Sequence, residues 1–231
     1  MSAYGDGERT LHVVDRTDDC LGWQVHPDER LARTSHAIAT DDGLWLLDPL
    51  DAPGLDESLA EYGEVAGVLV CSSWHARDAG TLAARHGVPV SVPTWLDRVA
   101  ERVETETERR LDAPGEFRFR ASNPLPSWQE AILYRERDDT LYVPESMGTS
   151  QFFCVGDERL GVSLYRRLLP PRAALADLDP DRILVGHGAG IEENAGGELA
   201  HALANARRRA PRAVFEHGPA AVSALWNSQR H

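Results

Sequence analysis

An apolar run that ends in polar and ionisable residues lies within the first half of the chain. Val68 to Cys71 is typical of a buried strand, and Ser72 to Gly80 is typical of a turn that leads into a helix. The turn carries His75, Arg77 and Asp78. A strand end that presents such side chains in a fixed array is a common position for chemistry in layered α/β proteins. We therefore expect the frame of an active site here.

Strand and helix patterns surround this feature. Four short β-prone runs come first, and Asp41-Asp42-Gly43 between two of them predicts a hairpin, because glycine accepts the positive φ of tight turns. A β-α-β-α-β alternation follows, which places helices outside a sheet. Next, we expect an amphipathic helix over Trp95–Leu111. The β-prone runs are Leu11–Val14, Leu21–Val25, His36–Thr40 and Leu44–Leu47, and the alternation includes Leu55–Tyr62, Gly67–Cys71, Arg77–His86 and Val88–Val92.

The same order of strands and then helices begins again in the second half. This repetition suggests two similar halves packed sheet against sheet, with helices outside, in a single domain over residues 1–231. The expected strands are Phe117–Arg120, Ala131–Glu136, Thr140–Val143 and Arg182–Val185, and the expected helices are Arg172–Asp177, Glu198–Arg209 and Val214–Trp226.

The charge composition narrows the classes of partner. The formal net charge is −13, and all 24 residues counted as Lys or Arg are arginine. So acidic a surface repels nucleic acid and anionic lipid, and we expect neither as a partner. Excess acid without lysine indicates a halophilic or GC-rich source, with compositional drift as the alternative explanation of the missing lysine.

Other features bear on the compartment. No apolar run approaches the roughly 20 residues that span a bilayer, and the first residues lack the basic-then-apolar pattern of a secretory signal. The three cysteines, Cys20, Cys71 and Cys154, are scattered and form no C-x-x-C motif. We therefore expect a cytoplasmic protein with buried free thiols.

Four stretches carry the residues suited to chemistry, each at a strand end. They are Ser35–Pro49, which ends in Leu-Asp48-Pro, then Ser72–Gly80, Leu141–Gly148 with Glu145, and Ile183–Gly188 with His187 between two glycines. In this order and spacing they resemble the metallo-β-lactamase superfamily over residues 33 to 205. The resemblance implies an α/β fold of the αββα sandwich type, with a metal site at the strand ends. It also implies that Asp48 anchors a loop.

The resemblance includes departures from the family's metal ligands. The family signature is His-x-His-x-Asp-His, followed by a later His, a bridging Asp and Gly-His-Gly. Matching Asp78-Ala-Gly80 to the family's His-Ala-Gly places Ser73 and His75 on the first two ligand positions. Arg77 then occupies the aspartate position, and Asp78 that of the last histidine.

The remaining ligand positions are also altered. Pro126-Ser127-Trp128 holds no histidine where the later His would fall. Glu145 takes the position of the bridging Asp, and His187 keeps its own. Because arginine cannot be deprotonated in a protein, we expect Arg77 to repel a cation and to pair with Asp78 and Glu145. A binuclear centre is therefore predicted to be lost.

Two functions remain open. The first is a metal-free ligand-binding protein or pseudo-enzyme, in which Arg77 replaces the cation. The alternative is a hydrolase of an ester, thioester or phosphoester, in which His75, Asp78, Glu145 and His187 hold a single Zn, Mn or Fe ion. Either function implies a small-molecule ligand or substrate.

The end of the chain offers apolar residues for a possible homodimer. They lie in the expected closing helix and are Val214, Phe215, Val222, Leu225 and Trp226. We prefer the interpretation in which this face covers the chain's own sandwich.

Overall fold

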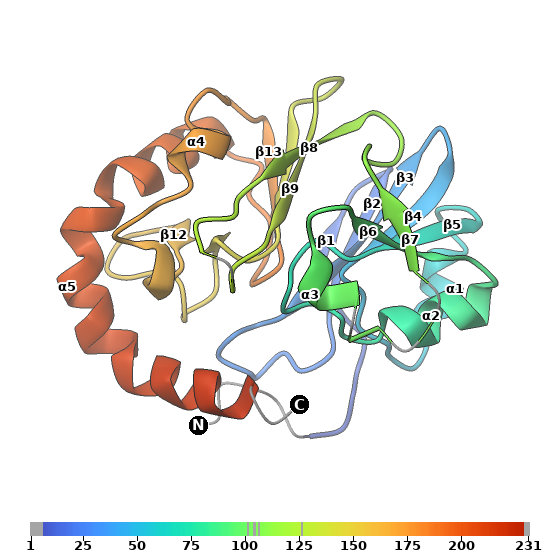
Figure 1. Ribbon diagram of the computed structural model, residues 1–231, viewed down its shortest axis with the longest axis horizontal. Coiled ribbons are helices and arrows are strands. Elements are labelled where there is room, and N and C mark those ends of the chain that lie inside the picture. The colour runs from blue at the N-terminus through green and yellow to red at the C-terminus, as the bar shows by residue number, and fades with distance from the viewer. Residues whose placement is uncertain (1–6, 101, 104, 106, 126, 229–231) are drawn as a thin grey trace.

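Two β-sheets face each other in the middle of the molecule, and helices cover the outer face of each sheet (Figure 1). The structure is a computed structural model, and it describes residues 7–100, 102–103, 105, 107–125 and 127–228. The layers run helix, sheet, sheet, helix, which confirms the predicted αββα sandwich.

The first sheet combines a meander with parallel strands in the order β1-β2-β3-β4-β5-β6-β7. Strands β1 to β4 are antiparallel, and β4 to β7 are parallel. Gly43 at the predicted hairpin has a φ of +109°. The strands are β1 (His12–Arg16), β2 (Cys20–Gln24), β3 (Thr34–Thr40), β4 (Gly43–Leu47), β5 (Val65–Leu69), β6 (Val90–Pro93) and β7 (Thr107–Arg110), and the helices in this half are α1 (Leu55–Leu59), α2 (Ala79–His86) and α3 (Asp97–Ala100).

The helix predicted over Trp95–Leu111 is wrong for most of its length. Among the described residues of this range only α3 is helical, whereas β7 pairs in parallel with β6 at the sheet edge. Thr107 begins this strand, and β-branched residues favour a pleated surface. Arg110 also lies over the Trp45 ring, 5.2 Å from its centroid, and fastens the edge strand to the sheet.

The second sheet has the order β13-β10-β9-β8, with β10 and β13 parallel. Alternate residues of its strands enter different cores. Tyr142 and Leu184 pack between the sheets, whereas Leu141 and Ile183 pack under the outer helices. The elements are β8 (Phe117–Ala121), β9 (Ala131–Arg135), β10 (Thr140–Val143), β11 (Met147–Gly148), β12 (Gly161–Val162), η1 (Leu164–Arg166), α4 (Arg172–Leu175), β13 (Arg182–Val185) and α5 (Ala195–Ser228).

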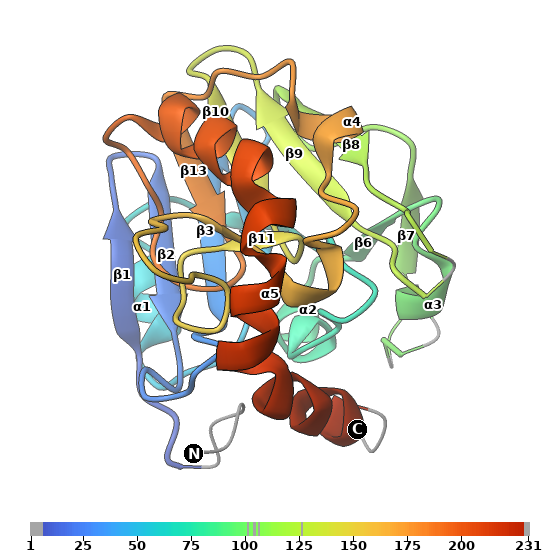
Figure 2. The same ribbon diagram turned by 90° about the vertical axis from the view of Figure 1, so that its left-hand side faces the viewer.

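A single long helix, α5, replaces the two predicted closing helices. It follows a curved course across the outer face of the second sheet (Figures 1 and 2). Pro211 lies inside it, although proline removes a helical hydrogen bond. Buried Ala206, Ala210 and Ala213 on either side of the proline keep the helix packed.

Two of the five apolar residues expected to cover the sandwich from α5 do not do so. Val214 is 58% and Phe215 86% exposed. Val222, Leu225 and Trp226 lie outside the residues whose side chains are described. Within the described part of the chain, no helix has the length and apolar character needed to cross a membrane.

Candidate functional site

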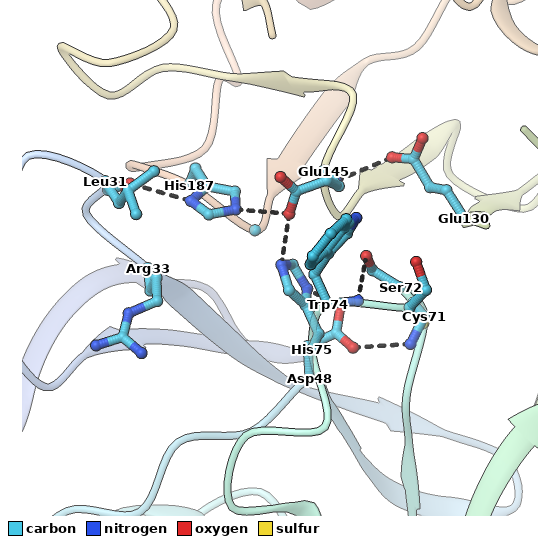
Figure 3. Close-up of polar contacts among 12 residues, drawn as sticks. Leu31, Arg33, Asp48, Cys71, Ser72, Trp74, His75, Glu130, Glu145 and His187 are labelled. Atoms are coloured by element: carbon cyan, nitrogen blue, oxygen red, sulfur yellow. Dashed lines mark hydrogen bonds and ion pairs between the residues drawn. The ribbon is translucent and has the colours of Figure 1, made fainter. Parts of the chain in front are cut away.

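Three side chains from three loops at strand ends meet at one edge of the sandwich (Figure 3). His75 lies between β5 and α2, Glu145 follows β10, and His187 follows β13. The Oε2 atom of Glu145 lies 2.8 Å from Nε2 of His75 and 3.1 Å from Nε2 of His187. Each residue offers a ligand atom, and these atoms lie within 4.8 Å of one another. We call these residues the His–Glu–His group.

The second nitrogen of each imidazole ring faces a fixed acceptor. Nδ1 of His75 donates to Oδ2 of Asp48 at 3.0 Å, and Nδ1 of His187 donates to the backbone oxygen of Leu31 at 3.1 Å. A neutral imidazole protonated on Nδ1 carries its lone pair on Nε2. In that form, the Nε2 lone pair of each ring is directed at the Glu145 carboxylate. Such fixing of ligand rings by outer acceptors is usual around metal sites.

Glycines on either side of His187 let the backbone pass close to its neighbours. A Cβ at Gly186 would lie 2.1 Å from the backbone oxygen of Pro144. Gly188 has a φ of +104°, which L side chains rarely adopt. Phe153 stacks on the His187 ring, with ring centroids 4.9 Å apart. The Gly-His-Gly motif therefore places His187 by close backbone packing.

Asp48 holds His75 and also joins the two sheets. Its side chain is fully buried and accepts hydrogen bonds from the Cys71 backbone N–H at 2.7 Å and the Tyr142 hydroxyl at 2.6 Å. Burial opposes ionisation, but the charge and hydrogen bond of His75 outweigh it and lower the pKa of Asp48. The sequence indicated only a loop anchor here, and the structure adds the contact with His75.

The pKa directions differ between the two histidines of the His–Glu–His group. Burial lowers the pKa of His187 in spite of its attraction to Glu145. Burial and Arg77 oppose charge on His75, but Asp48 and Glu145 outweigh them and raise its pKa. Burial raises the pKa of Glu145, yet the two histidines hold it well below its usual range. A neutral His187 has a single N–H for two acceptors, so one of its contacts lacks a proton or a cation.

Glu130, which the sequence did not single out, positions Glu145. Its fully buried carboxylate accepts hydrogen bonds from the backbone N–H groups of Glu145 at 2.9 Å and Ser146 at 2.8 Å. Burial raises the pKa of Glu130 in spite of these hydrogen bonds. The only signal for this role was a carboxylate directly before the apolar β9, and glutamate in general is seldom buried.

Asp78 does not join the group, although it was expected there as a fourth ligand. Its carboxylate accepts hydrogen bonds from Arg9 Nη1 at 2.6 Å and from the Asp51 backbone N–H at 2.9 Å. The structure therefore brings together His75, Glu145 and His187 and holds Asp78 outside them.

Arg77 does reach the group, but not in the expected way. Among the described contacts its guanidinium makes no hydrogen bond with Asp78 or Glu145. Nη1 donates to two backbone oxygens, and Nη2 lies 3.3 Å from Nε2 of His75. The predicted bidentate pairing of Arg77 with the two carboxylates is not formed.

The chemistry of the donor set fits one divalent ion. Two imidazole nitrogens and a carboxylate oxygen are ligands that Zn, Mn and Fe accept. A cation among them would remove the shortage of protons at His187 and leave both Nδ1–H groups bonded as they are. Three protein ligands also leave coordination positions for water or substrate.

No family model matches the chain, and no curated protein sequence matches it. A metallo-beta-lactamase from Pontibacter korlensis superposes with a TM-score of 0.56 at 14% identity, over 85% of this chain and 100% of that chain. A mutant flavo di-iron protein from Thermotoga maritima superposes with a TM-score of 0.58 at 13% identity, over 87% of this chain and 63% of that chain. The metallo-beta-lactamase FIM-1 from Pseudomonas aeruginosa, in its mono-zinc form, superposes with a TM-score of 0.54 at 9% identity, over 87% of this chain and 97% of that chain. The chain therefore has the metallo-β-lactamase fold.

Proposed function

We propose that the protein binds one divalent metal ion at the His–Glu–His group and acts as a metal-dependent hydrolase of a small molecule. One observation carries this proposal: both Nε2 atoms face the Glu145 carboxylate while both Nδ1 atoms already donate elsewhere. In neutral rings Nε2 is an acceptor like the carboxylate, and two acceptors that face each other need a cation or an added proton between them. Two of the structural neighbours named above are described as a mono-zinc form and a di-iron protein, which supports the choice of a metal.

The chain's own residues prepare the site for such an ion. Asp48 and the Leu31 backbone oxygen keep the two imidazoles protonated on Nδ1, so Nε2 faces the centre. Glu130 fixes the backbone at Glu145. A bound Zn, Mn or Fe ion would supply Lewis-acid activation of water for the hydrolysis of an ester, thioester or phosphoester.

The Arg77 contact favours a second candidate function. A permanent cation already lies 3.3 Å from Nε2 of His75, one of the three ligand atoms. In this alternative the protein binds a small molecule without a metal, and the guanidinium supplies the positive charge of the site.

Metal analysis distinguishes the two functions. The wild-type chain would be purified without chelator, offered Zn, Mn or Fe, and measured for bound metal and for hydrolysis of ester, thioester and phosphoester substrates. His187→Ala removes a ligand. His12→Ala is the matched control, because His12 is exposed on β1 and outside the group.

The proposal predicts one metal ion per chain in the wild type and in His12→Ala, and none in His187→Ala. Hydrolysis of one substrate class should follow the bound metal. Wild-type protein that takes up no metal under any loading, and whose stability EDTA leaves unchanged, contradicts the proposal and supports the metal-free candidate.

A further inference from the structure

Arg77 holds a positive charge against the carbonyl groups at three strand ends. Nη1 donates to the backbone oxygens of Thr34 and Asp48, each at 2.7 Å, and Nη2 donates to the backbone oxygen of Gly186 at 3.3 Å. These oxygens belong to the start of β3 and the loops after β4 and β13. The guanidinium therefore links both sheets beside the His–Glu–His group.

The remaining N–H on Nη2 points to the group itself. Nη2 lies 3.3 Å from Nε2 of His75. Nδ1 of His75 donates to Asp48, so Nε2 is the ring atom that faces both the Arg77 guanidinium and the Glu145 carboxylate. Arg77 therefore lies against the same ring atom that would bind a metal ion.

The backbone at Arg77 supports a specific role for this side chain. Its φ is +41°, in the left-handed region that non-glycine residues seldom occupy. Such conformations persist where the surroundings hold them, and they gather at functional sites. The carbonyl contacts are the surroundings that hold Arg77, and they keep its charge in place.

We propose that Arg77 is a built-in cation that competes with the metal ion for Nε2 of His75. This inference rests on the proposed function. A ring nitrogen that binds a metal ion has no lone pair left for a second partner, so metal binding must end the Arg77–His75 contact. The guanidinium also repels an incoming divalent ion at short range. Arg77 therefore weakens metal binding and sets the affinity of the site.

The test compares metal affinity, by competition with a chromogenic chelator, among four proteins. They are the wild type, Arg77→Gln, Arg77→Lys and Arg118→Gln, each titrated with Zn²⁺ and Mn²⁺. Arg118→Gln is the control for net charge, because Arg118 is an exposed residue of β8 paired with Glu136. Circular dichroism establishes which variants are folded.

Arg77→Gln is expected to bind the metal at least about tenfold more tightly than the wild type, because it removes the charge beside the ion. Arg77→Lys keeps a positive charge but not the planar set of donors, so its affinity should lie closer to the wild type than that of Arg77→Gln. Arg118→Gln should not differ from the wild type. Folded Arg77→Gln with unchanged or weaker affinity overturns the inference and leaves the single-metal proposal standing.

A measurement on the wild type keeps the inference testable if Arg77→Gln does not fold. In ¹⁵N NMR, the guanidinium signals of Arg77 and the ring signals of His75 should change together as metal is added. Arg77 signals that stay constant while the His75 signals shift would overturn the inference.

Two further outcomes separate this inference from the proposed function. Metal binding by Arg77→Gln but not by the wild type supports the competition and assigns the wild type to the metal-free candidate. No binding by any folded protein overturns the proposed function, and the inference with it.

Discussion

Two clusters of charged side chains join the sheets at opposite ends of the same strands. The first is the His–Glu–His group with Asp48 and Arg77, beyond the ends of β10 and β13. The second, which we call the Asp–Arg network, includes Arg135 at the end of β9 and Arg182 at the start of β13. Its members are Asp19, Arg135, Asp138 and Arg182.

The two clusters differ in how charges and donors are matched. In the Asp–Arg network two guanidinium groups face two carboxylates. Asp19 accepts hydrogen bonds from both Arg135 and Arg182, and Arg135 also donates to Asp138 at 2.8 Å. In the His–Glu–His group, by contrast, the Nε2 atoms of two histidines face a single carboxylate. In the Asp–Arg network the carboxylates are matched by guanidinium donors. The His–Glu–His group reaches such a match only when it binds a cation or protons.

The largest effect expected from this comparison is a loss of stability without a loss of metal. Arg135→Ala should lower the free energy of unfolding by about 3 kcal/mol, because Asp19 and Asp138 lose a buried partner. Its metal affinity should match the wild type, since Arg135 lies at the far end of the strands. Urea denaturation measures stability, and chelator competition measures affinity.

Arg118→Ala serves as the control for Arg135→Ala. Its ion pair with Glu136 is exposed, so its removal should cost less than about 1 kcal/mol. A loss of metal affinity in Arg135→Ala would mean that the two ends are coupled, and the division between a structural and a binding cluster would be wrong.

Local patterns were enough to predict most of the sandwich. The hairpin at Gly43 and the apolar runs that became β4 and β5 are signals contained within a few residues. The strand β7 was missed because its pairing with β6 depends on a neighbour far along the chain, and its charged residues also suit a helix surface. Pairing in the sheet overrode that local preference.

The candidate site also divides into residues that local sequence indicates and residues whose position depends on distant partners. His75, Glu145 and His187 could be predicted because each lies a few residues after an apolar strand run, and the resemblance to the metallo-β-lactamase superfamily placed all three at ligand positions. Asp78 could not be placed, because its carboxylate is bound by Arg9, 69 residues away in the chain. Glu130 was missed for a similar reason: its partners are the backbone N–H groups of a distant loop.

A smaller effect, on metal affinity, is expected from Glu130, the buried carboxylate that supports the His–Glu–His group. Glu130→Ala should weaken metal binding about tenfold, which is about 1.4 kcal/mol, because the backbone at Glu145 loses its anchor. Glu130→Gln should retain the wild-type affinity, since an amide oxygen can accept the same two hydrogen bonds. Chelator competition measures both, with exposed Glu136→Gln as the control. Equal loss in the Gln and Ala variants would show that the charge of Glu130, not its position, matters.

The smallest expected effect is a change in the free energy of unfolding at acid pH, caused by protonation of Asp19 in the Asp–Arg network. Burial raises the pKa of Asp19, but hydrogen bonds from Arg182 and Arg135 outweigh burial and hold it well below its usual range. A carboxyl whose pKa is depressed in the folded state contributes stability above its unfolded pKa, and that contribution is lost as the pH falls toward the folded value.

Between pH 7 and pH 3.5 the contribution of Asp19 should fall by about 0.7 kcal/mol, given an unfolded pKa of about 3.9. Asp19→Asn is less stable at neutral pH but has no such proton to bind. Its free energy of unfolding should therefore decline less than that of the wild type over the same range, in urea titrations at each pH. Parallel declines would show that the two arginines do not hold Asp19 ionised. The Asp–Arg network would then lack the matched charges that distinguish it from the metal-binding end.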